Sequence, residues 1–358
     1  MEPYLQENYG NASTAYSIGE DARRELEKSR EVIAATLHAK TSEIYFTSGG
    51  SESDNWAVKN IAAACKKKGR HIITTNIEHH AILNSCEYLE KLGYDVTYLE
   101  VDGDGLISPE QVMDAIRPDT TLISVMFANN EVGTIEPIYQ IGKIAREKQI
   151  LFHTDAVQAY AQIPLSVNYY PVDLLSASAH KFHGPKGVGF LYIRDGIDIP
   201  SFIHGGSQER GKRAGTENVA GIVGMAKAAE IAYGNMRKRV QKEIMLRNYL
   251  IERVMHEIPD AKLNGHRSIR LPGNVNFSFK GLEGASLLIL LDEDGICASG
   301  GSACNTGEER ISYVIKALGV PEEYAPGTIR LTLCGDTTRA DVDAALVSLK
   351  RNIAVLRG

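Results

Sequence analysis

The sequence predicts an α/β protein with a mostly parallel seven-stranded sheet between helices, followed by a smaller α+β domain. Short apolar runs alternate with amphipathic stretches over the first two thirds of the chain, which is the pattern of successive βαβ units. After about residue 220 the strands become fewer and shorter. The length of 358 residues fits about two domains, and we expect a large domain over 1–234 and a small one over 235–358.

Each strand and helix of the first two thirds has its own apolar pattern and boundary residues. Ser108 and Pro109, for example, fit the N-cap and the first turn of a helix. We predict strands over 43–48, 71–76, 95–101, 121–127, 150–155, 172–179 and 188–193. We predict helices over 52–68, 80–93, 108–116 and 137–148.

The last third of the chain has a different pattern. A long helical stretch runs from about Val219 to Ile258, and a closing helix begins near residue 339. Between them we predict strands over 274–279, 295–298 and 328–333 and helices over 284–293 and 309–318. This mixture is typical of a smaller α+β domain.

Composition and charge exclude several classes of protein. Hydrophobic residues make up 43% and charged residues 23% of the chain, which argues against disorder. The net charge of −6 gives no reason to expect nucleic acid or an anionic membrane as a partner. No transmembrane run or secretory signal is visible, so we expect a cytoplasmic protein. The five cysteines form no C-x-x-C pair, which argues against a metal site.

Polar residues follow five of the predicted strands. Open α/β sheets bind ligands at the carboxyl ends of their strands, so five such loops indicate one binding site. Each loop taken alone also has an ordinary structural interpretation as a turn or a helix cap. The loops lie at 47–51, 76–79, 128–131, 155–158 and 178–181.

Four of these loops suggest specific chemistry. Lys181 follows a strand and is either a Schiff-base nucleophile or a surface lysine. Asp155 either holds the pyridinium nitrogen of pyridoxal phosphate protonated or caps the next helix. Gly50 and Ser51 fit a phosphate site at a helix N-terminus, without the glycine pattern of dinucleotide-binding loops. His79 fits stacking on a planar cofactor, proton transfer or a structural role.

Two residues of the last third carry further candidate chemistry. Cys304 lies in a Gly/Ser-rich stretch, which predicts a flexible loop and an accessible, nucleophilic thiol. Cys297 ends an apolar run, which predicts a buried and inert thiol. Arg330 interrupts an apolar strand, so it either clamps a substrate carboxylate or pairs with a protein acid.

Together these motifs resemble the cysteine desulfurases of the NifS/IscS type, within the class V aminotransferase group of fold-type I pyridoxal phosphate enzymes. The resemblance covers nearly the whole chain in the family's order and spacing. It implies the fold-type I architecture, pyridoxal 5'-phosphate as cofactor and a homodimer. The matching segments are TSGGSESDN, EHHAI, NNEVGT, HTDAVQ, SASAHKFHGPKG, RAGTEN, GSAC and IRLTL.

The resemblance also implies a role for each matching residue. Lys181 would bond the cofactor, Cys304 would receive the sulfur, and His79 would stack on the ring and shuttle a proton. Asp155 would pair with the pyridinium nitrogen, and Gln158 would approach the phenolic oxygen of the ring. Asn130 and Arg330 would bind the substrate carboxylate, and Asn130 would also lie at the cofactor. The phosphate would be held by Gly50, Ser51, Ser178 and His180, together with Thr216 from a second subunit.

The implied reaction converts L-cysteine to L-alanine and leaves the sulfur on Cys304 as a persulfide. A sulfur-acceptor protein, such as an iron–sulfur scaffold or a tRNA-thiolation enzyme, would then take the sulfur. The resemblance implies no resident metal, although Cys304 could contact an iron–sulfur cluster transiently.

Alternatives to this activity remain open. Family members usually begin with an Asp-Asn-Ala-Ala-Thr-Thr type segment, whereas this chain begins Met-Glu-Pro-Tyr. One alternative is therefore a sulfur-relay protein that binds the cofactor without turnover. Another is a selenocysteine lyase, but the presence of Cys304 on its expected mobile loop favours the desulfurase. A nicotinamide-dependent dehydrogenase would need a glycine fingerprint that the sequence lacks.

Overall fold

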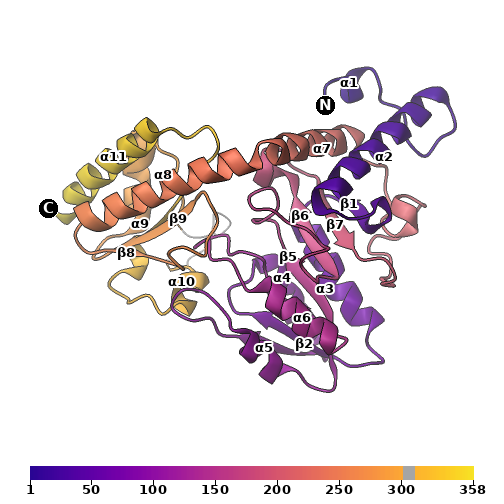
Figure 1. The fold of residues 1–358 in the computed structure, drawn as a ribbon, viewed down its shortest axis with the longest axis horizontal. Helices are drawn as coiled ribbons and strands as arrows, with labels where there is room; N and C mark the ends of the chain where they lie inside the picture. Colours follow the sequence, from indigo (N-terminus) through magenta and orange to yellow (C-terminus); the bar gives the residue numbers. More distant parts are fainter. Residues whose placement is uncertain (301–310) are drawn as a thin grey trace. The chain divides into compact units, whose positions relative to one another are not determined.

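Residues 1–300 and 311–358 are described in this computed structural model (Figure 1). The chain divides into two units, which are considered separately below. Two short segments from the first half, 100–107 and 128–136, belong to the second unit. Unit 1 comprises Met1–Leu99, Ser108–Phe127 and Pro137–Asn235, and unit 2 comprises Glu100–Ile107, Ala128–Glu136 and Met236–Gly358.

The centre of unit 1 is a seven-stranded sheet, as the sequence predicts. The strand order is β1-β7-β6-β5-β4-β2-β3, and β3, β2, β4, β5 and β6 pair in parallel. Strand β7 is antiparallel to both β6 and β1, so β1 runs in the same direction as β6. The strands are β1 (Ile44–Thr47), β2 (His71–Thr75), β3 (Asp95–Leu99), β4 (Thr120–Ser124), β5 (Leu151–Asp155), β6 (Leu174–Ser178) and β7 (Gly189–Ile193).

Helices cover this sheet. Helix α3 packs across β4 to β7, and its residue Trp56 is completely buried. The indole N–H of Trp56 donates to the backbone carbonyl of Pro200 at 3.0 Å. Helix α2, which we did not predict, packs along α7 (Figure 1). The helices are α1 (Pro3–Gln6), α2 (Ser17–Leu37), α3 (Gly50–Ala64), α4 (His80–Lys91), α5 (Pro109–Ala115), α6 (Ile138–Glu147) and α7 (Val219–Gly234).

Unit 2 is built on a three-stranded antiparallel sheet in the order β10-β9-β8. Because side chains alternate along a strand, the sheet has two unlike faces. Phe277 and Ile329 lie on the face that joins the apolar core, and Asn276 and Arg330 lie on the other, which we call the polar face. The elements are β8 (Ala261–Leu263), β9 (Asn274–Phe279), β10 (Thr328–Thr332), α8 (Met236–Glu257), α9 (Gly284–Glu293), α10 (Tyr313–Ala317) and α11 (Arg339–Arg357).

Two predicted elements of the last third are wrong. The helix predicted over 219–258 is interrupted at Asn235, which follows Gly234 and caps α7, because glycine and asparagine favour helix ends. No strand forms over 295–298. Gly295 adopts φ 76° as the chain leaves α9, and the first contact with the sheet is a single bridge between Ser299 and Arg330.

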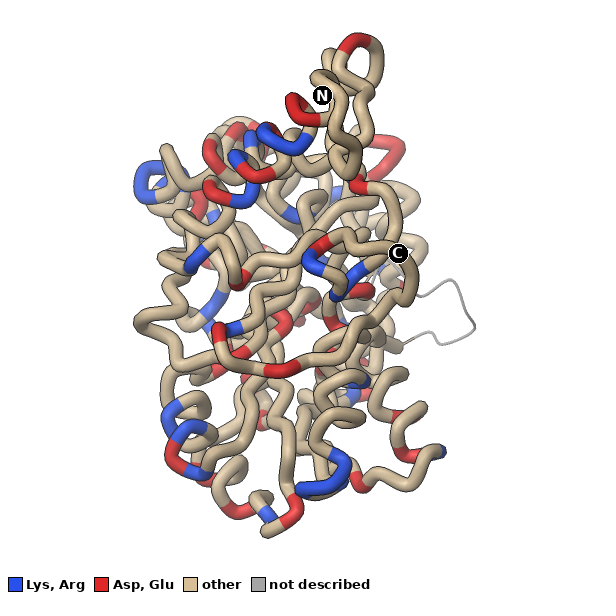
Figure 2. The backbone as a smooth tube through the Cα atoms, turned by 90° about the vertical axis from the view of Figure 1, so that its right-hand side faces the viewer, with Lys and Arg blue, Asp and Glu red and all other residues tan. Residues whose placement is uncertain are grey.

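The described chain offers no helix that is both long and apolar enough to span a membrane. In Figure 2, Lys and Arg residues are interspersed with Asp and Glu along the backbone. This distribution agrees with the small net charge of −6.

Candidate active site

The candidate site of unit 1 lies where strands β1, β2, β5 and β6 end. These strands run in one direction, so their carboxyl ends meet at one edge of the sheet. Asp155 ends β5, and the predicted residues Gly50, His79 and Lys181 lie three or four residues beyond the ends of β1, β2 and β6. The fifth predicted loop, 128–131, belongs to unit 2.

A pocket of about 470 Å³ opens at the N-terminus of α3. Gly49 caps this helix with φ 152°, and a Cβ on Gly50 would lie 2.6 Å from a methyl carbon of Val157. The first N–H groups of a helix have no intrahelical acceptor and attract anions. The pocket therefore fits a phosphate group. Its lining residues are Ser48, Gly49, Gly50, Ser51, Glu52, Ser178, His180, Lys186 and Gly187.

Four predicted phosphate ligands, Gly50, Ser51, Ser178 and His180, thus line one pocket. The Ser178 hydroxyl and Nδ1 of His180 are hydrogen-bonded at 2.9 Å. Burial, and then the charges of Lys181 and Lys186, lower the pKa of His180. Sequence reasoning missed Lys186, although it belongs to the HGPKG motif that follows Lys181.

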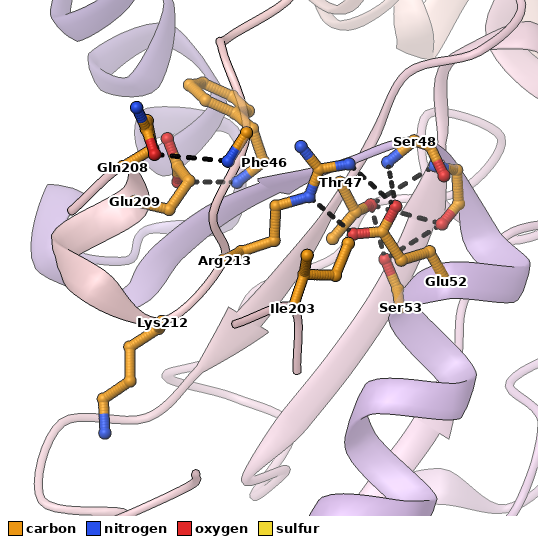
Figure 3. A network of polar contacts seen from close by, with 12 residues as sticks. Phe46, Thr47, Ser48, Glu52, Ser53, Ile203, Gln208, Glu209, Lys212 and Arg213 are labelled. Carbon is orange, nitrogen blue, oxygen red and sulfur yellow. Dashed lines mark hydrogen bonds and ion pairs between the residues drawn. The ribbon is translucent and has the colours of Figure 1, made fainter. Parts of the chain in front are cut away.

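Glu52 and Arg213 form a second feature that sequence reasoning missed (Figure 3). The guanidinium of Arg213 donates from Nε and Nη2 to the two Glu52 oxygens at 2.8 and 3.0 Å. The backbone N–H of Ser48 also donates to Glu52, at 2.8 Å. Burial raises the pKa of Glu52, but the hydrogen bonds from Arg213 and Ser48 outweigh it, so the net pKa is lowered. The carboxylate at the pocket is therefore ionised and neutralised by Arg213.

Arg213 belongs to a segment that continues to Thr216. In this segment Glu209 and Arg210 both adopt left-handed φ angles, 46° and 56°, which are unfavourable for residues other than glycine. The Glu209 carboxylate compensates by accepting the backbone N–H of Phe46 at 2.8 Å. Thr216 itself is exposed and does not line the pocket.

Asp155 ends β5 and is only 5% exposed. Its Oδ1 accepts the backbone N–H of Val157 at 2.8 Å. Burial raises the pKa of Asp155, while the neighbouring His79 and Lys181 act in the opposite direction. A cationic partner stabilises the ionised form of such a buried carboxylate, and a pyridinium nitrogen would be a partner of this kind. Gln158 is half-buried shortly after it.

Beneath Asp155, His153 lies on the same face of β5. Its Nδ1 is hydrogen-bonded to Ser124 at 2.9 Å and its Nε2 to Ser176 at 3.0 Å. Burial lowers the pKa of His153 to about 3, so the ring is neutral. Asp54 Oδ1 lies 3.7 Å from Nε2, and burial, followed by the charge of Asp155, raises the pKa of Asp54 well above its usual value. Asp54 and His153 are therefore a neutral contact rather than an ion pair.

His79 caps helix α4 and is held in one tautomer. Its Nδ1 accepts the backbone N–H of Ala81 at 3.1 Å, which leaves the proton of the neutral ring on Nε2. Burial lowers its pKa; the Asp155 charge raises it, and His80 and Lys181 lower it further. Lys181 lies in the 3₁₀ turn Ala179–Phe182 and is exposed in unit 1. The charges of His79, Asp155 and Lys181 thus act on one another at this edge of the sheet.

The two predicted carboxylate ligands lie together in unit 2. Arg330 Nη1 donates to the backbone carbonyl of Asn130 at 2.6 Å. Within the described residues, the Asn130 side-chain oxygen is buried and has no hydrogen-bond partner. The predicted sulfur acceptor Cys304 lies outside the described residues. Cys297 is exposed, so its predicted burial is wrong, because the chain there has left α9 without joining the sheet.

The comparisons agree with this arrangement. The aminotransferase class-V family model matches residues 1–345. The protein named cysteine desulfurase IscS from Dictyoglomus turgidum is 53% identical over 357 residues, covering 100% of this chain and 91% of that protein. A solved structure titled NifS-like protein is 40% identical, with TM-score 0.93, covering 99% of this chain and 94% of its own.

A second solved structure, titled SspA in complex with cysteine, is 38% identical, with TM-score 0.82, and 94% of each chain is covered. The family match spans the predicted strand-end loops and the small sheet alike. The chain therefore belongs to the aminotransferase class-V family and, within it, groups with the cysteine desulfurases.

Proposed function

We propose that the protein is a pyridoxal phosphate-dependent cysteine desulfurase, a sulfurtransferase that converts L-cysteine to L-alanine. The observation that carries this proposal is that His79, Asp155 and Lys181 lie within range of one another's charge at the sheet edge that also holds the pocket at the N-terminus of α3. The relatives add support, since one bears the name cysteine desulfurase and a similar structure contains cysteine.

The residues present fit the cofactor. The pocket at the α3 N-terminus would take the phosphate, and buried Asp155 would pair with the ring nitrogen. His79 would stack on the ring, Gln158 would approach its phenolic oxygen, and Thr216 of a second subunit would add a phosphate contact in a homodimer. When bound, the cofactor supplies an electron sink for bond breaking at the substrate.

The chain's own residues would divide the remaining work. Asn130 and Arg330 would bind the substrate carboxylate. Lys181 would act as the general base that takes the Cα proton of the substrate on its side-chain nitrogen. His79 can move a proton only at Nε2, because its Nδ1 is occupied by Ala81.

Sulfur transfer needs a thiolate acceptor, and we assign this role to Cys304. The thiolate attacks the substrate sulfur, so an S–S bond forms as the substrate's Cβ–S bond breaks. The electron pair of the broken bond stays with the carbon skeleton, which takes up protons and leaves as L-alanine. A sulfur-acceptor protein, such as an iron–sulfur scaffold or a tRNA-thiolation enzyme, would then receive the persulfide sulfur.

The proposal is tested by absorbance from 300 to 500 nm before and after adding L-cysteine, with alanine measured in parallel. We expect a visible cofactor band that changes with cysteine while alanine accumulates. After borohydride reduction and dialysis, the Lys181→Ala variant should retain no cofactor absorbance. The control variant Lys148→Ala, which changes an exposed lysine after α6, should retain it. Cofactor binding without alanine would point to a relay protein, and faster turnover of selenocysteine would point to a lyase.

A further inference from the structure

The polar face of the small sheet holds the segment that carries Asn130. Three consecutive backbone carbonyls of this segment are each bound by a side chain of unit 2. Arg330 donates to the carbonyl of Asn130 at 2.6 Å, and Asn276 Nδ2 donates to that of Glu131 at 3.2 Å. Arg270 donates to the carbonyl of Val132 at 2.6 Å.

The segment itself is folded to present these carbonyls. The Asn129 side-chain oxygen accepts the backbone N–H groups of Glu131 and Val132 at 2.8 and 3.0 Å. Gly133 then adopts φ 80°, and a Cβ there would lie 2.6 Å from the side-chain oxygen of Asn274. Asn274 also donates to the Glu131 carbonyl, at 3.3 Å. The turn therefore fits against the asparagines of β9 with no room for a side chain at Gly133.

Asn276 links this turn to Arg330. The two residues are directly paired across β9 and β10, so their side chains point to the same face. Asn276 is fully buried, and its Oδ1 accepts from Asn264 at 2.8 Å. Its amide can therefore donate toward Glu131 in only one orientation.

Arg270 adds a buried charge to the same turn. It is 3% exposed, and burial, then the charges of Arg247 and Arg267, lower its pKa. Burying a guanidinium is costly, and the contacts made by Nη2 of Arg270 are with Val132, Asn264 and Asn274. The acceptors of Arg270 Nη2 are therefore backbone carbonyls and an asparagine oxygen, so this group holds the turn in place and makes no ion pair with a described residue.

We infer that Asn276, supported by Arg270, is a positioning residue that sets the spacing between Asn130 and Arg330. This inference rests on the proposed function, in which that pair binds the substrate carboxylate. Asn276 does not touch the substrate in this scheme. It acts through the Glu131 carbonyl, so its loss lets the turn move relative to Arg330 and weakens binding of the carboxylate alone.

The test compares two ligands on the cofactor-loaded protein. L-Cysteine carries the carboxylate, and 2-aminoethanethiol is the same molecule without it. We expect Asn276→Leu to weaken L-cysteine binding, followed by absorbance, and to raise its KM roughly 3- to 10-fold, the range for one lost hydrogen bond. We expect 2-aminoethanethiol binding and the kcat for L-cysteine to change by less than about twofold, because only uniform binding is lost.

Asn352→Leu is the matched control. Asn352 is also a buried asparagine of unit 2, 4% exposed, but it donates to Asp294 and Ser348 on the far side of the core. It should leave binding of both ligands unchanged. Hydrogen exchange gives a readout without turnover: Asn276→Leu should speed exchange in the peptide spanning 128–136, and Asn352→Leu should speed it only in α11.

The inference is overturned if Asn276→Leu weakens both ligands equally, or if 128–136 exchanges at the wild-type rate. If the leucine variant does not fold, Asn276→Ser keeps a small polar side chain and is judged by the same criteria. Failure of the proposed function looks different, because the wild type itself would then bind L-cysteine no better than 2-aminoethanethiol.

Discussion

Arg30 and Glu209 form a bidentate ion pair in the interior of unit 1, with Nη1–Oε2 and Nη2–Oε1 distances of 2.8 and 2.9 Å. Each side chain is only 3% exposed. The pair fixes the left-handed turn at Glu209, from which the chain leads to Arg213 and Thr216. The ion pair therefore connects the interior of unit 1 to Arg213, which neutralises Glu52 at the pocket beside α3.

Breaking this pair should destabilise the protein strongly. Arg30→Ala leaves Glu209 as an uncompensated buried charge, which costs about 3 to 5 kcal/mol of unfolding free energy. Urea denaturation measures the loss. Asp21→Ala removes the exposed partner of Arg24 and should cost at most about 1 kcal/mol. Equal losses for the two variants would contradict the structural role of the buried pair.

Arg213→Ala should weaken phosphate-dependent cofactor binding. The substitution leaves the ionised Glu52 unneutralised at the pocket, so we expect the Kd for pyridoxal phosphate to rise roughly tenfold, with a smaller change for pyridoxal. Adding Glu52→Gln should recover part of the loss. Lys212→Ala is the control, because Lys212 points away from this network in Figure 3. An equal effect on pyridoxal would show that the pair does not act on the phosphate.

Asp54 and Asp155, the two buried aspartates beside the proposed cofactor ring, should respond differently to substitution by asparagine. Burial raises the pKa of Asp54 well above its usual value, and its neighbour His153 is neutral, so Asp54→Asn should leave kcat within about threefold. Asp155→Asn removes the charge that would hold the ring nitrogen protonated, and kcat should fall by about 100-fold or more. Steady-state alanine formation and the cofactor spectrum distinguish them. Similar losses in both variants would reject this division of roles.

Glu136 should make the free energy of unfolding fall as the pH rises. Burial raises its pKa to about 8, despite the hydrogen bond from Ile107, whereas a glutamate in an unfolded chain titrates near about 4.3. Between these values only the unfolded state ionises, so rising pH favours unfolding until the folded group also ionises near pH 8.

Glu136→Gln should therefore stabilise the protein increasingly from about pH 4 to about pH 8, by at most about 1.4 kcal/mol per pH unit. Denaturation across this range measures the difference. The control Glu322→Gln, at an exposed position of unit 2, should leave the pH profile unchanged. A Glu136→Gln profile parallel to that of the wild type would mean that Glu136 is ionised in the fold.

Cys304→Ser should abolish persulfide formation while the cofactor stays bound. Cys297 offers a nearby comparison, since it is an exposed thiol that our scheme leaves without a role. Cys297→Ser should retain the wild-type rate of sulfur transfer. Labelling with a persulfide-selective alkylating reagent and mass spectrometry reports both variants. Sulfide release by Cys304→Ser at the wild-type rate would remove Cys304 as the acceptor.

Local patterns in the sequence predicted the sheet and the strand-end loops because those features depend on neighbouring residues. Helix α2 was missed although Ala22, Leu26, Ile33 and Leu37 are buried at helical spacing, since its many charged residues obscured the apolar stripe. The interruption at Asn235 was missed because one glycine in a long amphipathic stretch is a weak signal.

The supporting contacts of the site were beyond the reach of such patterns. Glu52 and Arg213 are 161 residues apart, and Arg30 and Glu209 are 179 apart. Glu52 had a sufficient local explanation as a residue of the first helical turn. The tautomer of His79 was equally hidden, because it depends on a backbone N–H two residues away and on the helix that presents it.

The attachment of residues 299 and 312 has a consequence for protein engineering. Ser299 exchanges two backbone hydrogen bonds with Arg330, at 3.1 and 2.6 Å, and the Ser312 hydroxyl donates to the Glu131 carboxylate at 2.6 Å. Both junctions are therefore set by the same frame that holds Asn130. A redesign of unit 2 should therefore keep the backbone position of Ser299 and the hydroxyl of Ser312, because a change at either one also disturbs the frame of Asn130.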